Sequence, residues 1–188
     1  MQRIKCCIVG DEGVGKTSAI LAFMDNLVDN VKSTIGVDFY TKTVYSDNSK
    51  VHLAIWDTAG AERYRSLMRS YLRDAHIILI AYDVTNRKTD ILQWLRLAEQ
   101  YKPTVVCLLG IKDDLTCVNC HFEDVLAPWK RQNWKIVQGT CSSRNPKSVK
   151  KIIQQCVDKT TNHGASAPEH HKYIRIAPKK HQKQKCCT

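Results

Sequence analysis

The stretch Gly10-Asp11-Glu12-Gly13-Val14-Gly15-Lys16-Thr17 decides the fold, because it has the G-x-x-x-x-G-K-[ST] spacing of a phosphate-binding loop. An apolar strand pattern precedes it and a helical pattern follows it. The glycines let backbone N–H groups close around an anion, and the positive end of the next helix adds attraction. Lys16 brings a charge to the β- and γ-phosphates, and the Thr17 hydroxyl can ligate Mg²⁺. The spacing predicts a nucleotide site; the alternative, a tight glycine turn, is disfavoured by the motifs downstream.

Short apolar runs alternate with helical patterns along most of the chain. We predict strands over residues 3–9, 37–45, 51–56, 76–82, 104–109 and 134–137, and helices over residues 16–26, 61–71, 89–101, 122–132 and 146–162. Only residues 46–50 join the second and third strands, too few for a crossover helix, so this pair should be an antiparallel hairpin. Asn145 is a plausible N-cap before Pro146. The sum is an α/β fold: a doubly wound, mostly parallel six-stranded sheet with one antiparallel edge strand and helices on both faces.

Composition divides the chain into two parts, a nucleotide-binding domain over residues 1–165 and a flexible basic tail over residues 166–188. The net charge is +11, and the tail holds six basic residues against one acid. No basic helix or aromatic platform accompanies this charge, so we expect no nucleic-acid partner. An anionic membrane surface suits the tail better, at roughly 1 kcal/mol per Lys or Arg. Without a secretory signal, the nine cysteines are expected to be reduced thiols.

A second phosphate-side motif, Asp57-Thr58-Ala59-Gly60, ends the third predicted strand. Ligands of doubly wound sheets bind beyond the carboxyl ends of the strands. An Asp there can hold Mg²⁺ through water, and the bare N–H of Gly60 can approach a terminal phosphate. An Asp that only caps the next helix is the alternative. With the phosphate loop present, the metal role is favoured.

These motifs together resemble the Ras superfamily of small GTPases, and within it most closely the Rab branch. The resemblance covers residues 3 to about 162, in family order and spacing. It is carried by residues 10–17, 33–39, 56–60, 62–64, 82–85, 110–115 and 140–143. The run Ile35-Gly36-Val37-Asp38-Phe39, and Trp56 before Asp57, are similar to Rab rather than Ras or Rho. The absence of an inserted helix between Leu115 and Thr140 also argues against Rho.

The resemblance implies GTP/GDP as ligand, Mg²⁺ as cofactor, and a role for each matching residue. GTP would order the two switch segments and hydrolysis would release them, a change read by effectors. The implied nucleotide contacts are Asp11, Glu12, Gly13, Val14, Gly15, Lys16, Thr17, Ser18, Thr34, Gly60, Lys112, Asp114, Ser142, Ser143 and Arg144. The implied metal ligands are Thr17, Thr34 and Asp57, and the implied catalytic positions are Lys16, Thr34, Gly60 and residue 61. Ile35, Phe39, Trp56 and Tyr71 resemble the effector face, although packing alone is an equal alternative for Trp56.

Two departures from the family concern hydrolysis. Ala61 stands where the family has a glutamine that orients the attacking water, so intrinsic GTP hydrolysis is expected to be slow. Glu12 stands where a small residue usually faces the γ-phosphate. At ~5 Å and an effective dielectric of ~20, the Glu12 carboxylate and one phosphate charge repel each other by roughly 3 kcal/mol. The repulsion falls below about 1 kcal/mol if the Glu12 side chain swings into water. We expect it to swing out.

Two further departures concern the base. The family motif Asn-Lys-x-Asp reads Ile111-Lys112-Asp113-Asp114 here, which keeps Lys112 to lie over the ring and Asp114 to accept from guanine. Ile111 cannot make the side-chain hydrogen bonds that the family's asparagine makes to guanine and to the phosphate loop. Each lost bond would cost about 1 kcal/mol or more. Leu27 or Val28 replaces the aromatic that covers the base edge. Nucleotide should therefore bind more weakly and exchange faster than in a typical member.

The chain ends Lys185-Cys186-Cys187-Thr188, which resembles the double geranylgeranylation site of Rabs. Two lipid chains give stable anchoring where one does not. Palmitoylation or incidental cysteines remain alternatives. The implied location is the cytoplasmic face of intracellular membranes, in exchange with the cytosol.

Residues 117–121 spell C-x-x-C-H, a haem-attachment or zinc pattern, but no fourth zinc ligand at suitable spacing stands out, so we interpret it as coincidence.

The main interpretation is a membrane-anchored GTP switch with exchange factors, GTPase-activating proteins and effectors as partners, acting in vesicle traffic. The rival is a non-catalytic scaffold of the same fold that holds GTP permanently or binds nucleotide poorly, which Ala61, Glu12 and Ile111 favour.

Overall fold

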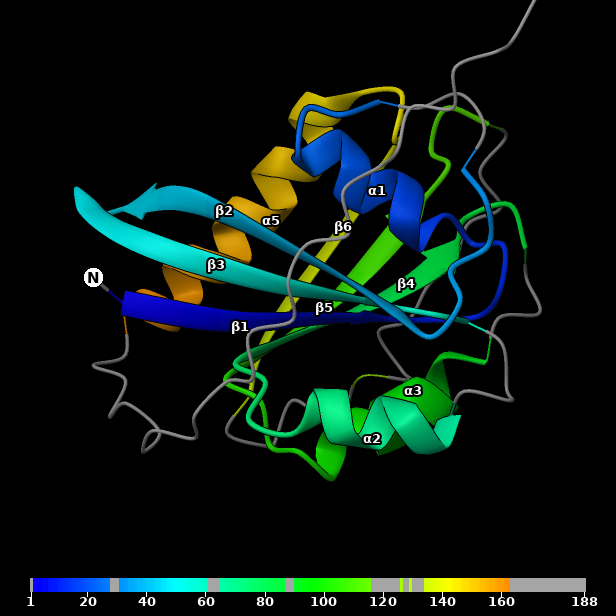
Figure 1. Cartoon of the computed structure of the whole chain (residues 1–188), viewed down its shortest axis with the longest axis horizontal. Helices are drawn as coiled ribbons and strands as arrows, with labels where there is room; N and C mark the ends of the chain where they lie inside the picture. Colours follow the sequence, from blue (N-terminus) through cyan, green and yellow to red (C-terminus); the bar gives the residue numbers. More distant parts are fainter. Residues whose placement is uncertain are drawn as a thin grey trace, which may run out of the picture.

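The computed structural model describes residues 2–27, 31–60, 65–86, 90–115, 126, 129 and 134–162. Its centre is a six-stranded sheet with the order β2-β3-β1-β4-β5-β6 (Figure 1). The strands are β1 (Gln2–Val9), β2 (Val37–Ser46), β3 (Ser49–Thr58), β4 (Ile77–Asp83), β5 (Val105–Ile111) and β6 (Lys135–Cys141). All neighbours pair in parallel except β2 and β3. The predicted fold, with β2 as the antiparallel edge strand, is confirmed.

Helices cover both faces of the sheet, as predicted (Figure 1). They are α1 (Lys16–Phe23), α2 (Arg65–Leu72), α3 (Ile91–Glu99) and α5 (Pro146–Thr161). Buried residues of α1 and α5 share one core cluster with the sheet, and those of α2 and α3 share the other. Every residue of β5 is buried and β4 is nearly so, because helices lie on both sides of these strands. In the part of the chain that the structure describes, no helix has the length and apolarity to cross a membrane.

The β2–β3 connection is shorter than the predicted loop over residues 46–50. The strands pair as far as Ser46 and Ser49, so only Asp47 and Asn48 form the turn. Their φ angles are 45° and 61°, the left-handed values that a two-residue hairpin turn requires and that Asp and Asn tolerate. Continued pairing therefore extended both strands beyond their predicted ends.

Other predicted boundaries also move. The helix predicted over residues 16–26 ends at Phe23, because Asp25 adopts a φ of 62° that a helix cannot contain. β5 and β6 run to Ile111 and Cys141, since pairing between neighbouring strands overrides the weak strand propensity of Gly110 and Gly139. Asn145 is the N-cap of α5 with Pro146 after it, but its side chain makes no capping hydrogen bond. Of the helix predicted over residues 122–132 the structure describes only Leu126 and Trp129, both buried.

Candidate functional site

The phosphate-type loop over residues 10–17 joins β1 to α1 at the carboxyl end of the sheet (Figure 1). Gly10 has a φ of 145°, and a Cβ there would stand 2.2 Å from the carbonyl oxygen of Ala81 in β4. Gly15, with a φ of 103°, occupies the N-cap of α1. Both positions exclude side chains, so the backbone N–H groups at the helix start stay open to an anion.

Lys16 is held inside the loop. Its Nζ donates to the carbonyl oxygens of Gly10 and Asp11, each at 2.8 Å, and only 6% of the residue is exposed. Burial lowers the pKa of Lys16, while the carboxylates of Asp57, Asp11 and Glu12 act in the opposite direction. Asp11 is itself fixed, because the Trp94 indole N–H donates to its Oδ1 at 3.0 Å. The ammonium group is therefore held within the loop, close to three acids.

The three predicted metal ligands lie together. The Oγ1 atoms of Thr17 and Thr34 are 2.8 Å apart and share a hydrogen bond. Asp57 is completely buried, and neither carboxylate oxygen has a hydrogen-bond partner of acceptable geometry among the described residues. Burial raises the pKa of Asp57 to about 6, although the nearby hydroxyl of Thr17 and the charge of Lys16 offset part of this shift. A buried carboxylate beside two hydroxyls is the kind of oxygen-donor set that Mg²⁺ prefers, so the residues fit the ion.

Gly60 closes the site from the end of β3. A Cβ at Gly60 would stand 2.5 Å from Lys16 Nζ and 2.6 Å from the backbone nitrogen of Glu12. Glu12 and Gly60 lie on the same hollow of about 200 Å³, together with Gly13, Gly15, Lys16, Thr17, Ser18, Val31, Lys32, Ser33, Thr34, Ile35 and Thr58. Val14 instead packs into the core below the loop. Most predicted phosphate-side residues therefore line one cavity.

The predicted base-side residues stand at the ends of the adjacent strands β5 and β6. Lys112 Nζ pairs with Asp83 Oδ2 at 2.6 Å. Burial alone would raise the Asp83 pKa, but hydrogen bonds from Lys112 and Thr85 outweigh it and hold the pKa below its usual value. Asp114 also follows β5, and a hydrogen bond from the buried Ser142, which follows β6, lowers its pKa. Both acids are thus kept ionised.

Arg144 and Ser143 complete this end of the site. Arg144 Nη1 lies 3.5 Å from Asp114 Oδ2, and the Arg144 backbone N–H donates to Ser142 Oγ at 3.0 Å. Ser143 follows in the turn between them and is partly exposed. Asp114 is therefore a fixed acceptor whose orientation comes from the turn after β6.

Ile111 has a position that sequence reasoning missed. Its side chain is 1% exposed and belongs to the core cluster under α1. Its Cγ2 atom lies 3.2 Å from the point where a Cβ on Gly15 would stand. An apolar methyl group therefore packs beneath the phosphate-type loop.

Four residues are predicted to form an effector face, and two of them, Phe39 and Trp56, are in contact. Phe39 and Trp56 are cross-strand partners whose ring centroids are 4.6 Å apart in an edge-on arrangement, and Phe39 is half exposed. Ile35 is 83% exposed, while Tyr71 on α2 is partly buried. Lys5, not anticipated from the sequence, places Nζ 4.8 Å from the Trp56 ring centroid. Trp56 therefore both packs and borders an exposed aromatic surface.

Several predictions concern residues outside the described ranges. These are the replacement at Ala61, the base-edge residue Val28, the C-x-x-C-H stretch, the lipidation sites Cys186 and Cys187, and the whole tail over residues 166–188.

Comparison with known proteins gives consistent matches. A family model described as Ras family matches residues 5–162. The Ras-related protein Rab-1 of Theileria parva is 38% identical over 173 residues, which cover 87% of this chain and 79% of the relative. The GTP-binding protein YPTM2 of Zea mays is 45% identical over 117 residues, or 60% of this chain and 58% of the relative. The Ras-related protein Rab-26 of Rattus norvegicus is 45% identical over 118 residues, or 60% of this chain and 46% of the relative.

Proposed function

Because this chain belongs to the Ras family of small GTPases and is Rab-like within it, we propose that it is a guanine-nucleotide switch that recruits effectors on membranes. The observation that carries the proposal is the buried carboxylate of Asp57, which lies beside the hydroxyls of Thr17 and Thr34 and has no hydrogen-bond partner of acceptable geometry among the described residues. A buried charge without partners is costly, so it is retained where a ligand satisfies it. A nucleotide-bound Mg²⁺ would do so.

The phosphates would bind over the N-terminus of α1, where the loop amides and the Lys16 ammonium face the hollow. Thr17, Thr34 and Asp57 would hold Mg²⁺, which would neutralise charge on the β- and γ-phosphates. Gly60 would donate its N–H to the terminal phosphate, because no side chain separates it from Lys16. Thr34 and Gly60 lie in different segments, so loss of the γ-phosphate would release both.

Guanine would be selected at the other end of the site. The ionised Asp114 would accept hydrogen bonds from the ring N–H and the amino group of guanine, which adenine cannot donate in that pattern. The stem of Lys112 would cover the ring while Asp83 holds its ammonium group. The turn after β6, with Ser142, Ser143 and Arg144, would border the base.

We propose slow intrinsic hydrolysis. Ala61 has no group that could orient a water molecule. GTPase-activating proteins of the Rab type resemble one another in supplying both an Arg and a Gln, so stimulated turnover would survive the loss. The GTP-bound form would then persist until such a partner arrives.

The C-terminal tail would provide the membrane anchor. Lipid on Cys186 and Cys187, together with the basic residues before them, supplies the two signals that stable attachment needs. We propose a role in vesicle traffic by analogy with the Rab branch as a whole. Mass spectrometry of the native protein tests the anchor, and unmodified cysteines would contradict it.

A second candidate, a scaffold of the same fold that binds nucleotide poorly, is favoured by one observation. Ile111 packs under the loop where the family has a hydrogen-bonding asparagine. Extraction and chromatography of the co-purified nucleotide separates the two. GDP indicates turnover, GTP a stalled switch, and an empty pocket a scaffold.

Calorimetry with Mg²⁺ tests the switch directly. We expect GDP and a GTP analogue to bind in preference to adenine nucleotides, with Asp114→Ala abolishing that preference. Adenine nucleotides binding as tightly would contradict the proposal.

A further inference from the structure

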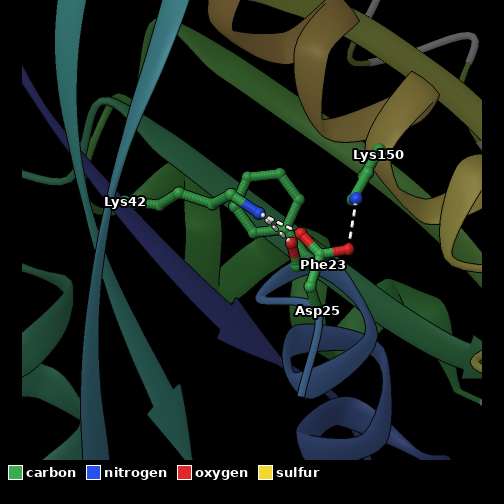
Figure 2. A network of polar contacts seen from close by, with 4 residues as sticks. All are labelled: Phe23, Asp25, Lys42 and Lys150. Atoms are coloured by element: carbon green, nitrogen blue, oxygen red, sulfur yellow. Dashed lines mark hydrogen bonds and ion pairs between the residues drawn. The ribbon is translucent and has the colours of Figure 1, made fainter. Parts of the chain in front are cut away.

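A cluster of charges joins three elements at the end of α1, and we call it the α1 clasp: Asp25, Lys42 of β2 and Lys150 of α5. Figure 2 shows both lysines directed at the Asp25 carboxylate. Lys42 Nζ lies 3.0 Å from Asp25 Oδ2, and Lys150 pairs with Oδ1. Both lysines lower the pKa of Asp25, and the hydrogen bond from Lys150 has the larger effect. One carboxylate thus connects α1, β2 and α5.

Lys42 is the central member of the clasp. Its Nζ also donates to the carbonyl oxygen of Phe23 at 2.6 Å and lies 4.8 Å from the Phe23 ring centroid (Figure 2). Phe23 is the last residue of α1, where carbonyl groups lack helical partners and the helix dipole favours a cation. Only 27% of the Lys42 side chain is exposed. Through these contacts Lys42, a residue of β2, caps the C-terminus of α1. Lys42 therefore does more than form an isolated surface ion pair.

The clasp joins two points of the chain that flank Thr34. Asp25 lies two residues after the end of α1, and Lys42 lies in β2 on the other side of Thr34 in the sequence. The hydroxyl of Thr34 reaches Thr17 near the start of α1. The clasp therefore ties the far end of the same helix to the strand that follows Thr34. Between these two contacts, β2 begins at Val37, and Gly36 O accepts from the Ala59 N–H at 2.9 Å.

We propose that the α1 clasp sets the rate at which this protein releases guanine nucleotide, by holding β2 against α1 so that Thr34 stays beside Thr17. The inference rests on the proposed function, because it needs a bound nucleotide and its Mg²⁺. Asp25, Lys42 and Lys150 act as positioning residues and touch neither. A partner that pulled β2 away from Asp25 would open the site without entering it.

Release of a fluorescent, non-hydrolysable GTP analogue in excess Mg²⁺ tests the clasp. Lys42→Met keeps the stem over Phe23 and removes the charge, and we expect release about fivefold faster. Asp25→Asn suits the φ of 62° and should act similarly, while Lys150→Met, at a more exposed pair, should act less. Lys151→Met, on the exposed side of α5, is the matched control. Release from Lys42→Met and Asp25→Asn at the control rate would overturn the inference.

A double-mutant cycle with Thr34→Ala separates positioning from general stability. If the clasp acts through Thr34, Lys42→Met should accelerate release much less in the Thr34→Ala background. An equal acceleration in both backgrounds would overturn the inference, even with unchanged melting temperatures. Failure of the wild type to bind the analogue contradicts the proposed function instead.

Amide hydrogen exchange on the nucleotide-free protein tests the clasp even if the wild type does not bind the analogue. The Ala59 N–H, bonded to Gly36 O, should exchange faster in Lys42→Met than in Lys151→Met. Equal exchange would count against the clasp independently of ligand.

Discussion

Replacement of Ile111 by asparagine should have opposite effects on the empty and the nucleotide-bound protein. Ile111 is 1% exposed and packs against the loop at Gly15. Losing that burial costs about 1.5–3 kcal/mol, and an unpaired buried amide costs about 1–3 kcal/mol more. We therefore expect Ile111→Asn to lower the free energy of unfolding of nucleotide-free protein by roughly 4 kcal/mol.

With guanine nucleotide bound, the new amide can bond to the base and to the loop. Two bonds at about 1 kcal/mol each should tighten GDP binding by roughly 30-fold. Urea denaturation of stripped protein gives the first quantity, and titration with a fluorescent GDP gives the second. Ile111→Val, which removes one methylene at about 1 kcal/mol, is the control that should leave affinity unchanged. GDP affinity of Ile111→Asn at or below the wild-type value would refute the reasoning.

Three other variants address the phosphate side of the site. Ala61→Gln should speed single-turnover GTP hydrolysis by roughly tenfold or more, since it restores a group that orients water; an unchanged phosphate-release rate would remove the explanation for slow turnover. Asp57 binds its proton more tightly in the folded, metal-free protein, at a pKa of about 6 against 3.8, so its contribution to stability falls as pH rises between those values. At pH 7 in EDTA, Asp57→Asn should be more stable to urea by up to ~3 kcal/mol, with the gap closing near pH 4; a gap independent of pH would contradict this. Gly60→Ala should weaken the binding of a GTP analogue more than that of GDP, because the new Cβ would meet the Glu12 backbone at 2.6 Å. Equal losses of affinity for the two nucleotides, measured by titration, would argue against a γ-phosphate contact.

Several features of the fold could be predicted because their physical causes are local. The glycine spacing of residues 10–17 depends on backbone conformations that follow directly from the residue types, and Gly10 and Gly15 have the positive φ angles expected of such a loop. The apolar runs of β4 and β5 predicted strands covered on both faces. The short connection after β2 required the antiparallel pair. Thr17, Thr34 and Asp57, assigned together from family resemblance, do lie together.

Contacts between distant residues could not be predicted in the same way. Nothing near Ile111 in the chain indicates that its methyl group lies under Gly15, and nothing near Lys42 indicates that it caps α1. The extent of β5 and β6 depended on pairing with neighbouring strands rather than on propensity. By itself the sequence determined the phosphate-type loop, the order of strands and helices and the family, since these arise from residue type and spacing. The tertiary structure alone decided which charges are paired and which carboxylate is left without partners, because burial and proximity come from packing elements that are far apart in the chain.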